Sequence, residues 1–153
     1  MARAYDLTPP HGMDSEFDFR GISDREAVRI GPFVVTPHLV NHPGEAYGIR
    51  VEADGKVLAF TGDTDTCEAL KGLCHNADLV LADSAFIDGR DDAQGIHLSG
   101  SRAARAAIDA GGVKRLMLTH LPPWNDPVVC RAQAGAVWPG LVELAEADAV
   151  HEL

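Results

Sequence analysis

The sequence predicts an α+β fold in which a mixed sheet carries helices on one face. Two strand-like runs flank the pair Asp54-Gly55, and this pair is typical of a tight antiparallel hairpin. After the hairpin, apolar strand-like runs alternate with stretches of helix formers, as in parallel strands joined by helices. The length of 153 residues is that of a single domain, which we expect to span residues 1–153.

The front of the chain is expected to be loop followed by antiparallel strands. Residues 1–27 are polar and contain Pro9-Pro10, so we predict a lead-in of loop with one short helix. Residues 28–40 are β-branched and apolar, which predicts one strand whose irregular end is marked by Pro37 and Pro43. The hairpin follows over residues 47–63.

The rear of the chain is expected to alternate helix and strand. Helices are predicted at residues 67–75, 101–112 and 128–138, and strands at 77–86, 113–120 and, as one strand or a pair, 141–153. The middle helix has the strongest signal, because Ser101 can cap its start and Gly111-Gly112 can end it.

Composition restricts the partners and the compartment. The net charge of −10 (13 Lys plus Arg against 23 Asp plus Glu) argues against a broad nucleic-acid surface. No run approaches the roughly 20 apolar residues of a membrane span, and the first residues lack the apolar core of a signal peptide. Three cysteines without a CxxC pattern favour a reduced, cytoplasmic chain, and we expect no membrane partner.

Metal-competent side chains follow three of the predicted strands. They are His42, Asp63 and His120, and His97 lies just before a predicted helix. Imidazole nitrogens and carboxylate oxygens are the ligands of Zn²⁺ or Mn²⁺ at hydrolytic sites. A histidine after a strand is also often a hydrogen-bonding residue, and Gly-Asp after a strand is often only a turn. Spacing alone leaves these interpretations open.

Four segments together resemble a known family. "HPGEAYGIR", "LAFTGDTDTCEAL", "ADLVLADSAF" and "HLSGSRAARAAIDAGGVKRLMLTHLPPW" occur in the order found in metallo-β-lactamase-fold hydrolases. These segments are similar to those of the branch that contains ribonuclease Z and bacterial cyclic-nucleotide phosphodiesterases. The resemblance runs from about Val28 to the C-terminus and implies the C-terminal half of an αββα layered fold.

The resemblance implies roles for individual residues. His42 corresponds to a ligand of one metal ion, Asp63 to the carboxylate that bridges two ions, and His120 to a ligand of the second. His97 corresponds to a catalytic histidine that assists proton transfer. The implied cofactors are two Zn²⁺ or Mn²⁺ ions in the complete protein. Asp65 is interpreted as a helix-cap or loop residue.

The HxHxDH motif of this family is absent from the 153 residues. Without it, three protein ligands serve two ions, whereas catalytic zinc normally has three protein ligands of its own. We therefore expect hydrolysis only if the missing half is supplied by a longer parent or another chain. The alternative is a truncated, non-catalytic fragment. The sheet face left uncovered is expected to meet a partner, for example in a homodimer, and residues 1–5 are read as the tail of a helix.

The segment between the matched ligands His42 and Asp63 indicates the size of the substrate. Ribonuclease Z enzymes carry a tRNA-gripping arm there, whereas here Asp63 follows His42 by only 21 positions, filled by the hairpin. With the acidic net charge, this favours a small phosphodiester such as a cyclic nucleotide, with tRNA processing as the alternative.

The roles of two residues stay open. Asp83 either orients a histidine or forms a turn, and Trp124 either lines a pocket or covers the sheet edge.

Overall fold

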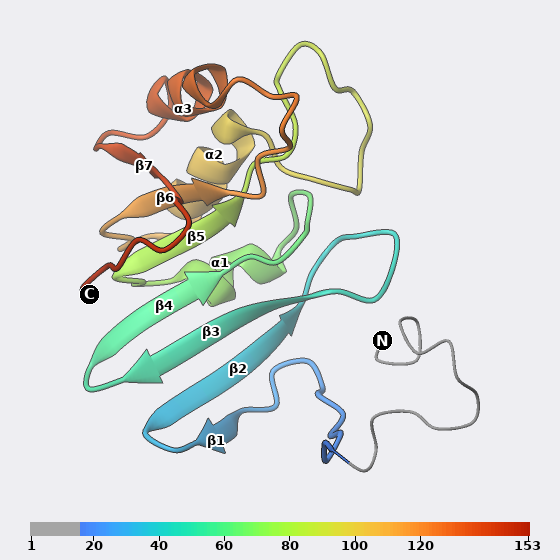
Figure 1. The fold of residues 1–153 in the computed structure, drawn as a ribbon, viewed down its shortest axis with the longest axis vertical. Coiled ribbons are helices and arrows are strands. Elements are labelled where there is room, and N and C mark those ends of the chain that lie inside the picture. Colours follow the sequence, from blue (N-terminus) through green and yellow to red (C-terminus); the bar gives the residue numbers. More distant parts are fainter. Residues whose placement is uncertain (1–15) are drawn as a thin grey trace.

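The structure is a computed structural model that describes residues 16–153. In these residues one seven-stranded mixed sheet has its strands in chain order (Figure 1). The first four strands pair antiparallel and β4 to β7 pair parallel. Their bounds are β1 Val28–Ile30, β2 Phe33–Leu39, β3 Tyr47–Ala53, β4 Lys56–Phe60, β5 Leu79–Asp83, β6 Leu116–Thr119 and β7 Val142–Leu144.

The hairpins explain one confirmed prediction and one wrong one. Asp54 and Gly55 both have positive φ (50° and 74°), the conformation that matches the twist of two antiparallel strands, so the β3–β4 hairpin is confirmed. The single strand expected over residues 28–40 is wrong. Gly31 adopts φ 58° before Pro32, and the chain folds back there with Ile30 opposite Phe33. Val28–Ile30 is therefore a separate strand.

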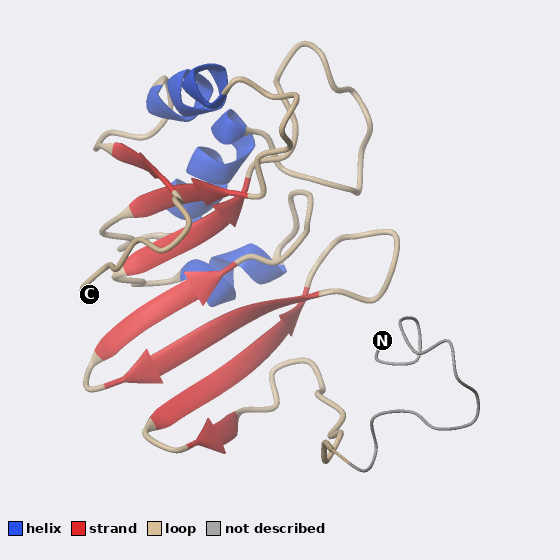
Figure 2. Cartoon of the chain, in the orientation of Figure 1, coloured by secondary structure: helices blue, strands red, loops and turns tan. Residues whose placement is uncertain are grey.

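Three helices connect the parallel strands: α1 Ala69–Cys74, α2 Gly100–Ala110 and α3 Pro127–Gly135. Parallel connections in one sheet are right-handed, and with the strands in chain order all three helices fall on the same face, as predicted (Figure 2). The cap of α2 is Ser99, which accepts a hydrogen bond from the Arg102 N–H, and not Ser101. Gly111, at φ 73°, ends α2 as expected. α1 is shorter than predicted at both ends, whereas α2 and α3 begin one residue earlier than predicted and end two and three residues earlier.

The core lies between the sheet and these helices. Leu116 and Leu118 of β6 and Val80 of β5 are buried against the alanines of α2. Small residues allow α2 to lie close to its neighbour. A Cβ on Gly100 would lie 2.2 Å from the carbonyl oxygen of Cys130 in α3, so the helix crossing requires glycine there. This crossing fixes the start of α2, directly behind His97.

No helix of the described residues covers the other face of the sheet over β2 to β4, although Pro37 on that face is buried. Gly48 and the Arg50 side chain face α1, and the alternate residues of β3 therefore point to the opposite side. The cross-strand pairs place apolar side chains there in rows, among them Val35, Val51 and Leu58. On the same face Phe33, Leu39 and Phe60 are exposed. A broad apolar surface thus stands open to a partner.

The two ends of the chain add little regular structure. Residues 16–27 form turns and loop without a helix, and the helix predicted at residues 1–5 lies outside the described part. Of the predicted strand or strand pair at 141–153, only β7 forms. Within residues 16–153 no helix has both the length and the apolar character needed to cross a bilayer.

Candidate active site

The predicted site residues meet at one edge of the sheet. Since β4, β5 and β6 are parallel, their carboxyl ends share an edge, and β2 ends there too because two antiparallel pairings separate it from β4 (Figure 1). Asp63 follows β4, Asp83 ends β5 and His120 follows β6. His42 follows β2. The edge therefore gathers residues that lie far apart in the sequence.

Asp83 and His97 form the most buried pair of the site. The distance from His97 Nδ1 to Asp83 Oδ2 is 2.8 Å, and the Asp83 side chain is almost fully enclosed. The same carboxylate accepts hydrogen bonds from the backbone N–H groups of Thr64 (3.0 Å) and Ala85 (3.0 Å). These bonds orient the imidazole through Nδ1, which leaves Nε2 as the nitrogen free to exchange a proton or bind a ligand.

His120 lies between two carboxylates. Its Nδ1 is 3.3 Å from Asp63 Oδ1 and 3.3 Å from Asp83 Oδ1. Its backbone has φ 57°, a left-handed conformation that costs energy for a residue with a Cβ. The strand thus ends in a kink at the residue that carries the imidazole, and strain of this kind is concentrated at functional sites.

His42 completes the group. Its ring centroid lies 5.6 Å from that of His97, and the His97 centroid lies 4.9 Å from that of His120. The loop of His42 is joined to that of Asp63 by a bridge between Asn41 and Asp65. The structure therefore brings together all four predicted residues, His42, Asp63, His97 and His120. Their roles as metal ligands and acid stay predictions.

The donor set fits a divalent ion. Imidazole nitrogens and carboxylate oxygens are zinc ligands, and His120 Nδ1 lies 3.3 Å from Asp63 Oδ1 and equally 3.3 Å from Asp83 Oδ1, so this distance does not choose between the two carboxylates. Donor atoms of Asp83, His97 and His120 also lie within 4.8 Å of one another. Asp83 accepts backbone N–H groups and contacts His97 Nδ1, so it orients that imidazole; these contacts do not remove it from the candidate ligands, because ligating carboxylates are also hydrogen-bonded.

Asp65 has a structural role that sequence reasoning did not find. It does not cap α1, where the capping residue is Glu68. Its buried carboxylate accepts hydrogen bonds from the Gly95 N–H (2.7 Å) and from Arg102 Nη1 (2.7 Å). Asp65 thereby ties the loop of Asp63 to the loop and helix that flank His97. No sequence signal identifies these contacts, because the partners lie 30 and 37 positions away.

A cavity of about 610 Å³ opens beside His97 and His120. It is lined mainly by apolar and aromatic side chains, with Arg90 and Asp91 at its rim, and Trp124 is one of its walls. Its volume is in the range of small-molecule sites. Of the two interpretations of Trp124, the pocket-lining one is therefore the one the structure supports.

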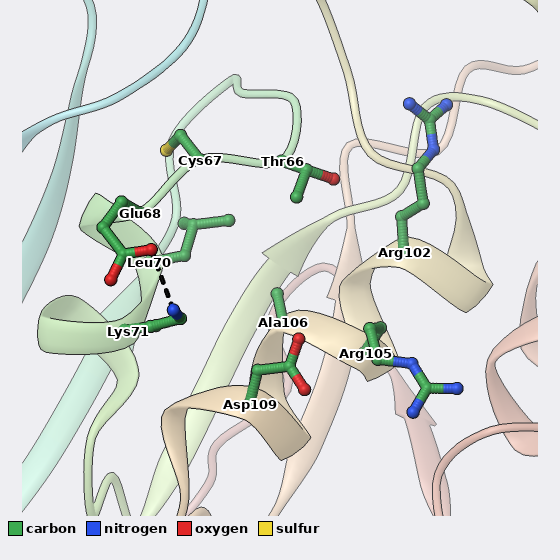
Figure 3. Close-up of a pocket in the computed structure, with 9 residues that line it drawn as sticks. All are labelled: Thr66, Cys67, Glu68, Leu70, Lys71, Arg102, Arg105, Ala106 and Asp109. Carbon is green, nitrogen blue, oxygen red and sulfur yellow. Dashed lines mark ion pairs between the residues drawn. The ribbon is translucent and has the colours of Figure 1, made fainter.

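A second hollow, of about 330 Å³, lies between α1 and α2 (Figure 3). Its charges are largely paired locally, since Lys71 lies 2.8 Å from Glu68 and Arg102 turns out of the hollow toward Asp65. Arg105 lies on the exposed side of α2. None of the predicted site residues lines this hollow, whereas His97 and His120 line the other cavity.

A comparison with family models assigns the chain to a protein family. Residues 6–121 match the model of the β-lactamase superfamily domain, so the chain belongs to this family. The mixed sheet with helices on one face agrees with it: the metallo-β-lactamase-fold protein YhfI of Bacillus subtilis superposes with a TM-score of 0.79 at 27% identity, over 86% of this chain and 54% of that one.

Curated relatives give the same picture. The uncharacterized protein ML1173 of Mycobacterium leprae is 40% identical over 121 residues, covering 77% of this chain and 42% of the relative. A ribonuclease Z of Sulfurisphaera tokodaii is 38% identical over 93 residues, covering 52% and 31%. The chain thus spans half or less of the length of these relatives, and the resemblance to the ribonuclease Z branch is confirmed.

Proposed function

We propose that this chain carries part of the active site of a metal-dependent phosphodiester hydrolase that acts on a small substrate such as a cyclic nucleotide. The observation that supports it is the meeting of His42, Asp63, His97 and His120 at one edge of the sheet, around the buried Asp83. Two imidazoles, a carboxylate and a third, separately oriented imidazole are the groups that metal-assisted hydrolysis requires.

The proposed metal-binding residues are His42, Asp63 and His120, and the ions would be Zn²⁺ or Mn²⁺. A bound ion lowers the pKa of a coordinated water and neutralises phosphate oxygens. His97 is proposed as the general acid: Asp83 holds its Nδ1, so Nε2 can donate a proton to the leaving oxygen. Imidazole suits this step because its ordinary pKa lies near neutral pH.

A small substrate is favoured by the space around the site. The segment between His42 and Asp63 is the β3–β4 hairpin, with no added arm that could hold a tRNA. The net charge of −10 also opposes a long polyanion. Ribonuclease Z-like cleavage is therefore the alternative, supported by the similarity to ribonuclease Z proteins.

A second candidate is a non-catalytic fragment. The HxHxDH motif is absent and the chain spans about half of its relatives, so the ligand set within these residues is small for two ions. The apolar face of β2 to β4 would then be covered by a second copy, in a homodimer. The face carries Phe33, Leu39 and Phe60 in exposed positions, which a dimer would bury.

The test is to measure bound zinc or manganese per chain, mass in solution, and hydrolysis of 3′,5′-cyclic AMP beside a tRNA precursor. In the complete protein, with the missing half supplied, the proposal predicts bound metal and cleavage of cyclic AMP, both lost in Asp63→Ala and kept in His151→Ala, a control for an exposed histidine outside the site. Cleavage of the precursor alone would select the tRNA alternative. A complete protein that binds no metal and shows no activity would establish the non-catalytic interpretation.

A further inference from the structure

Trp124 is an exposed aromatic side chain on a well-anchored turn. It is 75% exposed, while the other tryptophan, Trp138, is 8% exposed. The turn is stiffened by Pro122-Pro123 before it and by a hydrogen bond from the Asn125 N–H to the Pro122 carbonyl (2.9 Å). A single exposed apolar side chain is common on protein surfaces, but this indole also forms a wall of the cavity that contains His97 and His120.

The residue next to Trp124 ties the turn to the centre of the molecule. Asn125 is buried, and its side-chain amide donates to the carbonyl of Ala85 at 2.8 Å. Ala85 lies two residues after Asp83, so this hydrogen bond anchors the turn to the segment that also carries Asp83. The position of the indole relative to His97 and His120 is thereby fixed by the fold.

The cavity beside Trp124 is lined by apolar and aromatic side chains together with two imidazoles, those of His97 and His120. The apolar and aromatic side chains include Phe86, Ile96, Pro122 and Trp124. The Phe86 ring packs edge-on against His97 with 5.3 Å between centroids. A ligand in this cavity would therefore lie against aromatic surfaces and present one end to the imidazoles.

The polar groups of the cavity do not make it an anion site. Arg90 donates to Asp91 (2.6 Å) and to the Asn125 side-chain oxygen (2.8 Å), so its charge is balanced. Its Nη1 makes no hydrogen bond within residues 16–153 and remains a donor at the rim. Apolar walls with one directed donor suit a neutral, planar heteroaromatic ring better than a second phosphate.

We infer that this cavity is a nucleobase subsite in which the base of the substrate stacks on Trp124 while its phosphodiester faces His97 and His120. The inference rests on the proposed function for the ligand class, and it adds the residue that recognises the ligand. Stacking on an indole is tolerant of sequence, so several bases are accepted. Trp124 is thus a substrate-binding residue that favours ligands with a base over ligands without one, and it takes no part in bond cleavage.

The test measures binding in the presence of EDTA, so neither metal nor turnover is needed. In the Trp138→Phe variant the emission of the remaining tryptophan reports on position 124. We expect adenosine and adenosine 5′-monophosphate to quench it saturably and ribose 5-phosphate to leave it unchanged. Equilibrium dialysis of labelled adenosine 5′-monophosphate with the unmodified chain checks the result without the Trp138 change.

Variants then separate stacking from simple loss of surface. Trp124→Ala should weaken adenosine 5′-monophosphate binding about 5- to 150-fold in dialysis, and Trp124→Phe much less, because a ring remains. Leu141→Ala, at an apolar residue that is 80% exposed on another loop, is the matched control and should bind like the unmodified chain.

The possible failures are distinguishable. Equal binding of ribose 5-phosphate and adenosine 5′-monophosphate, unaffected by Trp124→Ala, would overturn the nucleobase subsite and indicate recognition of phosphate alone. Quenching by octanoate but not by adenosine would overturn it in favour of an acyl ligand. If adenosine binds through Trp124 but cyclic AMP is not hydrolysed, the subsite stands and the proposed reaction is wrong.

Discussion

The two ends of β5 carry two buried aspartates with opposite surroundings. Asp78, just before the strand, is 5% exposed; it accepts from Lys114 Nζ (2.7 Å) and the Val57 N–H (2.8 Å), with Lys56 at 3.8 Å. The hydrogen bond from Lys114 holds the pKa of Asp78 below its usual value. Asp83, the last residue of the strand, is 1% exposed and contacts two imidazoles, with no Lys or Arg among its hydrogen-bond or ion-pair partners in residues 16–153.

The difference separates a structural carboxylate from a functional one. Lysine keeps its charge at all ordinary pH values, so the ion pair between Asp78 and Lys114 is permanent. Asp78 therefore has a structural role at the end of β5 that lies away from the site. The partners of Asp83 are imidazoles, side chains that can serve as metal ligands or in proton transfer. Burial alone does not mark an active site, and the kind of partner does.

The largest effect is expected from Asp83→Asn. The amide cannot hold both histidines and both backbone N–H groups, so zinc affinity and kcat/KM for cyclic AMP should fall about 10- to 100-fold. The imidazole ¹⁵N shifts of His97 should also change from one tautomer to a mixture. Isothermal titration, kinetics and NMR measure the three quantities.

Asp78→Asn is the matched change at the other end of the same strand. It should lower the melting temperature by a few degrees and leave zinc affinity and kcat/KM within about twofold, since no candidate ligand contacts it. If Asp78→Asn weakens zinc binding as strongly as Asp83→Asn, the two ends of β5 are not functionally different and the assignment of Asp83 is wrong.

An intermediate effect is expected from Asp65→Asn, which breaks the tie between the Asp63 loop and the His97 loop. The Arg102 ion pair and the Gly95 hydrogen bond both lose their charged acceptor, which costs about 2 kcal/mol of unfolding free energy. Hydrogen exchange at the Gly95 amide should become faster, while exchange at the Asp78-supported Val57 amide should not. Unchanged protection of Gly95 would contradict the proposed tie.

The smallest effect concerns His38, a buried imidazole without the carboxylate that His97 has. Its Nδ1 has no hydrogen-bond partner within the described residues, and burial, followed by the Arg25 charge, lowers its pKa from 6.5; Asp24 opposes this shift and Arg50 adds the smallest contribution to it. The unfolded chain therefore takes up a proton at higher pH than the folded one. Stability should fall as pH drops below about 6.5, by no more than about 1.4 kcal/mol per pH unit for one proton.

His38→Gln removes this titration, and urea unfolding between pH 7.5 and 5 compares the two chains. The variant should show a flatter dependence of unfolding free energy on pH than the unmodified chain. Parallel curves would mean that His38 gains its proton equally in both states, against the expectation from its burial.

Much of the fold was predictable because its signals are local. The Asp54-Gly55 turn, the Gly111 stop of α2 and the alternation of strands and helices each depend on a few adjacent residues. The errors came from competing local choices. Gly31-Pro32 could sit inside an irregular strand or turn it back, and Ser99 competed with Ser101 as the cap. Packing of Gly100 against α3 fixed the helix start.

For the site, the sequence by itself determined the residue types and their order along the chain, and with them the family resemblance to which His42, Asp63, His97 and His120 belong. Only the tertiary structure decided that Asp83 holds two of these histidines, that Asp65 ties their loops, and that Trp124 walls the adjoining cavity. The reason is that hydrogen bonds and cavity walls join residues separated by tens of positions, and such pairs leave no pattern in a single sequence.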